Sequence, residues 1–224
     1  MRHQPITVGH RGASALAAEN TLRAFELAIE HGLDMAELDV HLSKDRQLVV
    51  IHDADLRRVA GRPHRVADLT AVELAGFGVP SLTDVFALAR GKLGIYVELK
   101  GPNTGVALAD LMRSGAAEGV TLIGGSFTPE LVAQLRDGAP ETPRSVLFAR
   151  AAVEHMLCTC SELAATYAHP CFRPVDQPMV DAFHARGLLV MTPHTNNAAE
   201  AQAFKDLGVD VIASDDPRVL AQLK

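Results

Sequence analysis

Short apolar runs alternate with longer Ala- and Leu-rich stretches along the whole chain. Several runs, such as Leu188–Met191, are apolar at every position, which is typical of parallel strands covered on both faces. The nine candidate strands are Ile6–Val8, Met35–Val40, Leu48–Ile51, Gly94–Leu99, Val120–Ile123, Ser145–Phe148, Thr166–His169, Leu188–Met191 and Val209–Ala213.

The stretch between the first two runs has helical spacing. Apolar residues recur every three or four positions from Leu22 to Ile29, after the polar pair Asn20–Thr21 and before Gly32. A polar side chain commonly caps the start of a helix, and glycine commonly ends one. The pattern therefore predicts a helix between a strand and the next strand.

Nine strands are one more than a closed (β/α)8 barrel needs. Ser43–Gln47 joins the second and third runs without room for a crossover helix, so these two runs are expected to form an antiparallel hairpin. Residues 1–224 are then expected to form a single α/β domain, a (β/α)8 TIM barrel, with an extra β-hairpin after strand 2 and a short insertion before strand 3. A doubly wound sheet is the alternative. The Arg-, Gly- and Pro-rich stretch Arg57–Pro80 is the candidate for an irregular insertion.

Composition indicates one folded domain and excludes some classes of partner. The 224 residues are 48% hydrophobic, without Trp, and carry 21 Lys and Arg against 27 Asp and Glu, a net charge of −6. An acidic chain is poorly suited to non-specific nucleic-acid binding. The sequence lacks a run of about 18 apolar residues and an apolar signal-peptide core, so no stable membrane association and a cytoplasmic location are expected. A monomer and a homodimer both remain open.

Three carboxylates occur near the ends of predicted strands. Glu37 and Asp39 alternate with apolar residues, so they share one face of their strand, and Glu98 ends the next barrel strand. If the strand ends are solvated, these are ordinary exposed acids. If they meet in the barrel lumen, like charges there need a cation, and an all-oxygen set favours Mg²⁺ or Ca²⁺ over Zn²⁺, with Mn²⁺ a third candidate.

Two histidines and two cations also follow strands. His10 and His52 end apolar runs and are candidates for an acid–base pair, although a single histidine there is more often structural. Arg11 offers a planar fork that suits phosphate oxygens, the alternative being an ion pair at the rim. Lys100 shares the face of Glu98.

These residues lie in a pattern that resembles the signature of glycerophosphodiester phosphodiesterases. The matching segments are His10-Arg11-Gly12-Ala13, Glu19-Asn20-Thr21, Ala24-Phe25, Gly32, Glu37-Leu38-Asp39-Val40, Lys44-Asp45 and His52-Asp53. The match continues more thinly through Leu56 and Arg58, Pro80-Ser81-Leu82, Val97-Glu98-Leu99-Lys100, Ser126-Phe127, Gly187, Asn196, Gly208-Val209-Asp210 and Ser214-Asp215-Asp216-Pro217. The resemblance spans nearly the whole chain and is thinnest from Leu131 to Ala182.

The resemblance implies metal-dependent hydrolysis of small-molecule glycerophosphodiesters to glycerol 3-phosphate and an alcohol. It assigns His10 and His52 to acid–base catalysis, Glu37, Asp39 and Glu98 to one divalent cation, and Arg11 and Lys100 to the phosphate. Glu19 and Asn20 match a substrate-binding motif, although Asn20 also fits a helix cap. The implied reaction passes through a cyclic 1,2-phosphate formed by the glycerol 2-hydroxyl and then opened by water.

The chain departs from the family pattern late in the sequence. Pro193-His194-Thr195-Asn196 stands where the family usually has Trp-Thr-Val-Asn, so an aromatic wall is expected to be missing. His194 is a candidate substrate contact or a structural imidazole. The insertion after His52 is short, which predicts a small cap over the site.

Three other readings stay open. A related lyase would act on lysophospholipids and release a cyclic phosphate, and a non-catalytic barrel would only bind glycerol phosphates. A zinc site from the late cysteines and histidines is disfavoured because the spacing lacks paired thiolates, the candidates being His155, Cys158, Cys160, His169 and Cys171.

Overall fold

The computed structural model describes residues 4–172 and 174–223, and within them the barrel prediction is confirmed. Eight parallel strands form the wall, in the order β8-β7-β6-β5-β4-β2-β1-β9, and a parallel bridge between Met191 and Val211 joins the last strand to the first. The barrel strands are β1 (Ile6–Gly9), β2 (Met35–Leu42), β4 (Gly94–Leu99), β5 (Leu122–Ser126), β6 (Arg144–Phe148), β7 (Tyr167–Pro170), β8 (Leu189–Val190) and β9 (Val211–Ser214).

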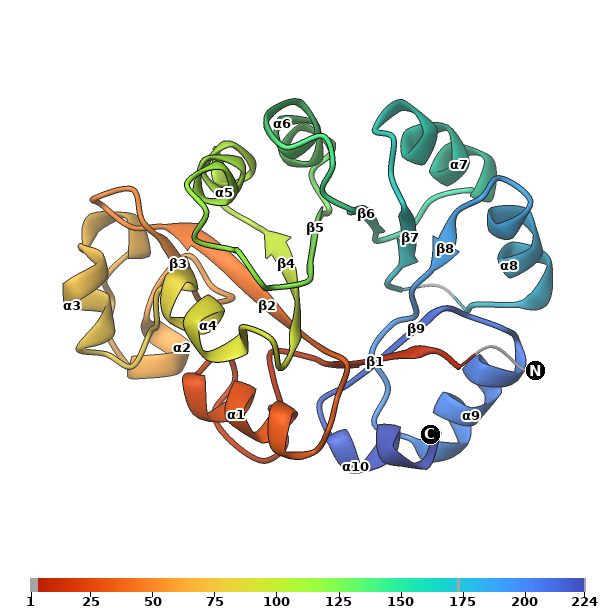
Figure 1. The fold of residues 1–224 in the computed structure, drawn as a ribbon, viewed down its shortest axis with the longest axis horizontal. Coiled ribbons are helices and arrows are strands. Elements are labelled where there is room, and N and C mark those ends of the chain that lie inside the picture. Colours follow the sequence, from red (N-terminus) through yellow and green to blue (C-terminus); the bar gives the residue numbers. More distant parts are fainter. Residues whose placement is uncertain (1–3, 173, 224) are drawn as a thin grey trace.

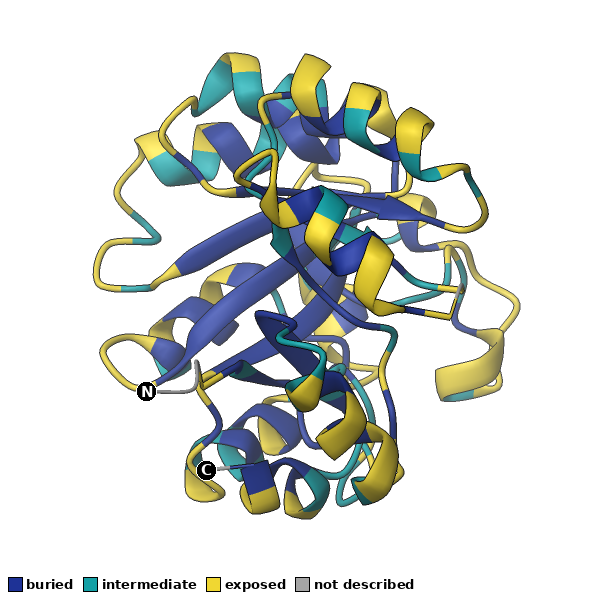
Figure 2. Cartoon of the chain, turned by 90° about the vertical axis from the view of Figure 1, so that its right-hand side faces the viewer, coloured by how far each residue is buried: buried dark blue, intermediate teal, exposed yellow. Residues whose placement is uncertain are grey.

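Helices surround this wall on the outside (Figure 1). They are α1 (Leu22–Glu30), α4 (Leu82–Ala89), α5 (Thr104–Arg113), α6 (Pro129–Gly138), α7 (Val153–Glu162), α8 (Gln177–His184), α9 (Ala198–Asp206), α10 (Pro217–Leu220) and the 3-10 turn η2 (Ala221–Leu223). Their inner faces are buried and their outer faces exposed, as the colouring in Figure 2 shows. None of the described helices is long and apolar enough to cross a bilayer.

The predicted hairpin is present. β3 (Leu48–Val50) pairs antiparallel with the far end of β2, where Val40 faces Val50 and Leu42 faces Leu48. The insertion that follows is more regular than the composition predicts, since it contains α2 (Arg57–Ala60), η1 (Val66–Asp68) and α3 (Ala71–Ala75). It has a small apolar core of its own around Leu56, Val66 and Leu74. This core fixes the insertion beside the hairpin (Figure 1).

Two larger apolar cores hold the barrel. One lies between strands and helices and includes the fully buried Phe25, Phe86 and Phe183. The other fills the lumen with one side chain from each barrel strand or its end, namely Val8, Met35, Tyr96, Ile123, Leu147, Tyr167, Met191 and Val211. This lumen layer is the floor on which the residues farther along each strand stand.

The boundary of β5 differs most from the prediction. The apolar run suggests a strand over Val120–Ile123, whereas the strand covers Leu122–Ser126. Gly124 and Gly125 carry no strand signal, but both lie where the packing leaves little room for a side chain. A Cβ on Gly124 would lie 2.2 Å from the end of the Leu135 side chain of α6, and one on Gly125 would lie 2.9 Å from the Tyr96 ring.

The loop between β1 and α1 turns tightly against the helix. Gly12 has φ +81°, and a Cβ there would lie 2.8 Å from backbone and side-chain atoms of Ala24. The close approach fixes the path of the loop that carries the residues before and after Gly12.

We predict that Gly12→Ala lowers the free energy of unfolding more than Gly61→Ala does. Gly61 also has positive φ, +64°, but its Cβ would meet no atom within 4 Å. The control therefore loses only the left-handed strain of about 1 kcal/mol, whereas Gly12→Ala adds an overpacking cost of roughly 1–3 kcal/mol. Urea denaturation measures both, and equal losses would contradict the packing argument.

Candidate active site

The carboxyl ends of β1, β2 and β4 bring the predicted site residues together. Side chains alternate along a strand, so positions two and four beyond the lumen layer also point inward. From Met35 this count reaches Glu37 and Asp39, and from Tyr96 it reaches Glu98 and Lys100. From Val8 it reaches His10.

The three predicted metal ligands form one cluster. Each of Glu37, Asp39 and Glu98 offers a carboxylate oxygen within 4.8 Å of the others. Asp39 and Glu98 are direct partners in the β2–β4 register, which is why they meet. Their side chains are 1% and 13% exposed, so Asp39 is buried, Glu98 is partly buried, and neither is the solvated strand end of the alternative reading.

This burial makes it unfavourable for all three carboxylates to be ionised at once. Burial and the neighbouring Asp39 raise the pKa of Glu37 to about 8, and the same two causes raise the pKa of Glu98. A divalent cation would relieve this repulsion, and the donor set, made only of oxygen, suits a hard ion. The residues present therefore fit a divalent metal.

Two cations already lie against the cluster. Lys100 Nζ donates to Glu98 Oε1 at 2.9 Å and lies 3.4 Å from Asp39 Oδ1. Arg11 Nε lies 3.4 Å from Asp39 Oδ2. Nε is buried and, among the described residues, finds no hydrogen-bond acceptor. An unsatisfied buried donor beside the cavity is suited to an anionic ligand oxygen.

Arg11 is also held by its backbone. Its φ is +54°, and its N–H donates to Glu37 Oε2 at 3.0 Å. Its Nη1 donates to Glu19 Oε1 at 2.9 Å. The sequence prediction places Glu19 at the substrate, and the structure places it against the Arg11 side chain.

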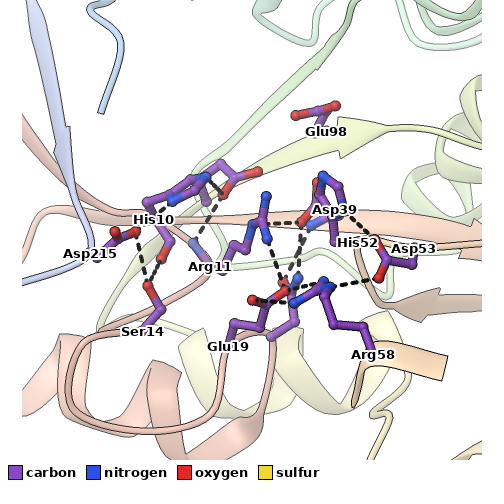
Figure 3. A network of polar contacts seen from close by, with 12 residues as sticks. His10, Arg11, Ser14, Glu19, Asp39, His52, Asp53, Arg58, Glu98 and Asp215 are labelled. Atoms are coloured by element: carbon purple, nitrogen blue, oxygen red, sulfur yellow. Dashed lines mark hydrogen bonds and ion pairs between the residues drawn. The ribbon is translucent and has the colours of Figure 1, made fainter. Parts of the chain in front are cut away.

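His10 lies on the opposite flank of the cluster from His52, with Nε2 3.9 Å from Glu37 Oε2 (Figure 3). Its Nδ1 is 2.7 Å from Asp215 Oδ1. Burial disfavours the charged ring, but the hydrogen bond to Asp215 and the charge of Glu37 together outweigh this effect and raise the pKa of His10. Asp215 is in turn bound by Ser14 Oγ and by Asn196 Nδ2.

His194 stacks on His10. The ring centroids are 4.3 Å apart and the planes differ by 8°. With Asp215, these rings form a second group of potential metal ligands within 4.8 Å. Imidazole lone pairs lie in the ring plane, and two parallel rings cannot both direct them at one ion. The stack is therefore a packing contact in this geometry.

His52 is the other predicted acid–base residue. Its Nδ1 is 2.6 Å from Asp53 Oδ1. Each catalytic candidate ring therefore has an aspartate on Nδ1, which fixes the ring and leaves Nε2 for proton transfer.

Asn20 does not cap α1. Thr21 is the cap, since its hydroxyl accepts from Ala24 N–H, and the helix-cap interpretation of Asn20 is wrong. The amide of Asn20 is buried and donates to Asp39 Oδ2 at 2.9 Å. The structure thus places Asn20 behind a candidate metal ligand.

The site opens into a cavity of about 410 Å³. Its floor is apolar and includes Leu147, Met191 and Val211 of the lumen layer, and Phe127 and Phe172 stack 6.1 Å apart at its rim. Aromatic side chains therefore do line the cavity, from other positions than the one where the family pattern has Trp.

His169 also lines the cavity and is neutral. Its Nε2 lies 2.9 Å from the carbonyl oxygen of Thr192, which can only accept, so Nε2 carries the proton. Its Nδ1 lies 3.3 Å from the Tyr96 hydroxyl, and burial lowers its pKa to about 4. His169 therefore adds no charge to the site.

The disfavoured zinc site is not assembled. Cys158 is exposed on α7, Cys160 is buried in the core between strands and helices, and Cys171 lines the cavity. None of the three belongs to a metal-capable group among the described residues.

Comparisons with known proteins agree with this geometry. Residues 10–219 match the sequence model of the Glycerophosphoryl diester phosphodiesterase family. The chain is 31% identical to YhdW of Bacillus subtilis (strain 168), provisionally named a glycerophosphodiester phosphodiesterase, over 94% of each chain. A shorter match, 48% identical over 30% of this chain and 21% of the relative, is to the Rattus norvegicus lysophospholipase D GDPD1.

Solved structures show the same fold. The glycerophosphodiester phosphodiesterase of Thermotoga maritima superposes with a TM-score of 0.85, at 26% identity and over all of both chains. The family match covers nearly the whole chain, and His10, Arg11, Glu37, His52, Glu98 and Lys100 line one cavity. This chain therefore belongs to the glycerophosphoryl diester phosphodiesterase family of phosphoric diester hydrolases.

Proposed function

We propose that this chain hydrolyses small glycerophosphodiesters to glycerol 3-phosphate and an alcohol, using one divalent cation and the pair His10 and His52. Family membership supports the reaction class. The cation, the histidine roles and the cyclic intermediate are our proposals.

One observation supports the proposal most strongly. Three carboxylates from adjacent strands cluster within 4.8 Å beside the cavity; Glu37 and Asp39 are buried and Glu98 is partly buried. Two imidazoles flank them, each held through Nδ1 by an aspartate (Figure 3). Acids alone would repel an anionic substrate, and histidines alone would not neutralise it. The combination suits phosphoryl transfer.

Glu37, Asp39 and Glu98 would hold Mg²⁺, Ca²⁺ or Mn²⁺, and the bound ion would supply positive charge next to the phosphoryl oxygens. Arg11 and Lys100 would bind the remaining phosphoryl oxygens. Asn20 would keep Asp39 oriented through its amide hydrogen bond. These contacts would hold the phosphodiester between the two histidines.

One histidine would remove the proton from the glycerol 2-hydroxyl as that oxygen attacks phosphorus. The other would protonate the departing alcohol oxygen, leaving a cyclic 1,2-phosphate. Water would then open the ring with the two histidines in exchanged roles. The aspartates on Nδ1 would stabilise whichever ring carries the extra proton.

A second candidate is cleavage of lysophospholipids. The apolar floor of the cavity and the exposed Phe127–Phe172 pair favour a leaving group with apolar surface. The partial match to a lysophospholipase D is consistent with this candidate. Substrate preference and product identity distinguish it from the main proposal.

A cytoplasmic location and a monomeric or dimeric state stay predictions from the sequence.

We predict that Mg²⁺ or Ca²⁺ alone raises the thermal midpoint of chelator-treated protein. A ligand at 100 times its dissociation constant adds about 2.7 kcal/mol, which is on the order of 5–10 °C for a chain of this size. Glu98→Gln should abolish most of this shift, and the matched control Glu118→Gln, at an exposed loop position, should keep it. A full shift in Glu98→Gln would argue against the carboxylate cluster as the metal site.

We predict that His10→Ala and His52→Ala each lower kcat on glycerophosphoethanolamine by about 10²–10⁴-fold, because each removes a proton-transfer group. Both variants should retain the metal-induced thermal shift. His155→Ala, at an exposed position of α7, is the matched control and should behave as the unaltered protein. Unchanged kcat in either active-site variant would remove that ring from the mechanism.

We predict that glycerol 3-phosphate is the final product from glycerophosphocholine, with a cyclic phosphate visible only early in the reaction by phosphorus NMR. Water opens the cyclic ester at the same site, so it should not accumulate. A cyclic phosphate that persists, together with faster turnover of lysophospholipids, would favour the lyase instead.

A further inference from the structure

Arg58 bonds both the carboxylate that holds His52 and the carboxylate that holds Arg11. It lies on α2, in the insertion, and its guanidinium uses all three nitrogens. Nη1 and Nη2 donate to the two oxygens of Glu19, each at 2.7 Å, and Nε donates to Asp53 Oδ2 at 2.6 Å (Figure 3). Such a two-pronged pair with a third bond on Nε is specific to arginine.

On one side of Arg58 lies the proton-transfer group. Asp53 bonds Arg58 through Oδ2 and His52 Nδ1 through Oδ1. An aspartate carboxylate is ionised at neutral pH and only accepts hydrogen bonds, and the hydrogen bond from Arg58 lowers its pKa further, to about 2. Arg58 holds Oδ2, so that Oδ1 faces the His52 ring. His52 must then carry its proton on Nδ1, which leaves Nε2 free to accept the substrate proton.

On the other side lies the phosphate-binding cation. Glu19 Oε1 accepts both from Arg58 Nη2 and from Arg11 Nη1. Because Glu19 is shared by two guanidinium groups, it neutralises only part of the Arg11 charge. Without Arg58, the carboxylate would pair with Arg11 alone and reduce the positive charge left for a phosphate.

We propose that Arg58 is a positioning residue, which holds Asp53 against His52 and Glu19 against Arg11 without touching the substrate. This inference rests on the proposed function. It also explains how the insertion contributes to the site, because the separate apolar core of the insertion fixes α2, the helix that carries Arg58.

The proposal separates two kinetic effects. Loss of the Asp53 contact should lower kcat, since the His52 ring loses its fixed tautomer, and loss of the Glu19 contact should raise KM, since Arg11 binds phosphate less well. Arg58→Ala and Arg58→Lys should both lower kcat by about 10–100-fold, the usual range for residues that orient a site, and raise KM several-fold. Lysine keeps the charge but cannot make the three bonds.

Double variants test the two routes. In an Asp53→Asn background, Arg58→Ala should still raise KM but lower kcat no further. In a Glu19→Gln background it should still lower kcat but leave KM unchanged. The matched control is Arg57→Ala, because Arg57 is on the same helix with a side chain 73% exposed and pairs only at 3.8 Å with Asp55. It should leave kcat and KM unchanged.

A readout without substrate separates this proposal from the proposed function. Nitrogen-15 NMR of the His52 ring should show one tautomer, protonated on Nδ1, in the unaltered protein and a mixture in Arg58→Lys. If the unaltered protein turns over no glycerophosphodiester, the proposed function fails and the tautomer measurement still tests Arg58. An unchanged tautomer in Arg58→Lys would overturn the proposal. A double variant whose loss of kcat equals the product of the separate losses in Arg58→Ala and Asp53→Asn would also overturn it.

Discussion

Three carboxylates stand within 4.8 Å of one another above the apolar floor of the barrel lumen, and their mutual repulsion shapes the site around them. Glu37 and Asp39 are buried and Glu98 is partly buried, directly above a layer of side chains without charge, so water screens their charges only weakly. Charges of one sign at this depth destabilise the fold unless cations or protons offset them. Lys100 and Arg11 offset part of this charge, and the cluster has the composition to bind a divalent ion for the remainder.

The barrel divides into a charged half and a neutral half. β1, β2 and β4 and the loops after them carry His10, Arg11 and the acids, whereas β6 to β8 present Leu147, neutral His169 and Met191 to the same cavity. A phosphodiester with a charged phosphoryl group and a less polar alcohol would match this division. The arrangement follows from chain order, since neighbouring strands in the sequence are neighbours in the barrel (Figure 1).

The sequence predicts the barrel and the groups that do chemistry because both depend on local pattern. Alternation places Glu37 and Asp39 on one face, and the short link after Val40 requires a hairpin, whatever the rest of the chain does. The β5 boundary was less predictable, because Gly124 and Gly125 are there for packing against other elements and carry no strand preference of their own.

The residues that orient the site were the least accessible to sequence reasoning. Asp215 lies 205 positions from His10, and Arg58 meets Glu19 across 39 positions. Only the fold reveals such pairs. Asn20 shows the converse, since its place before a helix suggests a cap while its buried amide bonds Asp39. Asp53 and Asp215 lie in segments that carry the family resemblance, but sequence reasoning assigned neither of them a role.

The position of a bound ion would show directly whether the three carboxylates form a metal site. Crystals of the protein grown with Mn²⁺ and measured for anomalous scattering should show one strong peak coordinated by oxygens of Glu37, Asp39 and Glu98. An empty cluster at saturating Mn²⁺, or a peak held instead by His10, His194 and Asp215, would contradict the account.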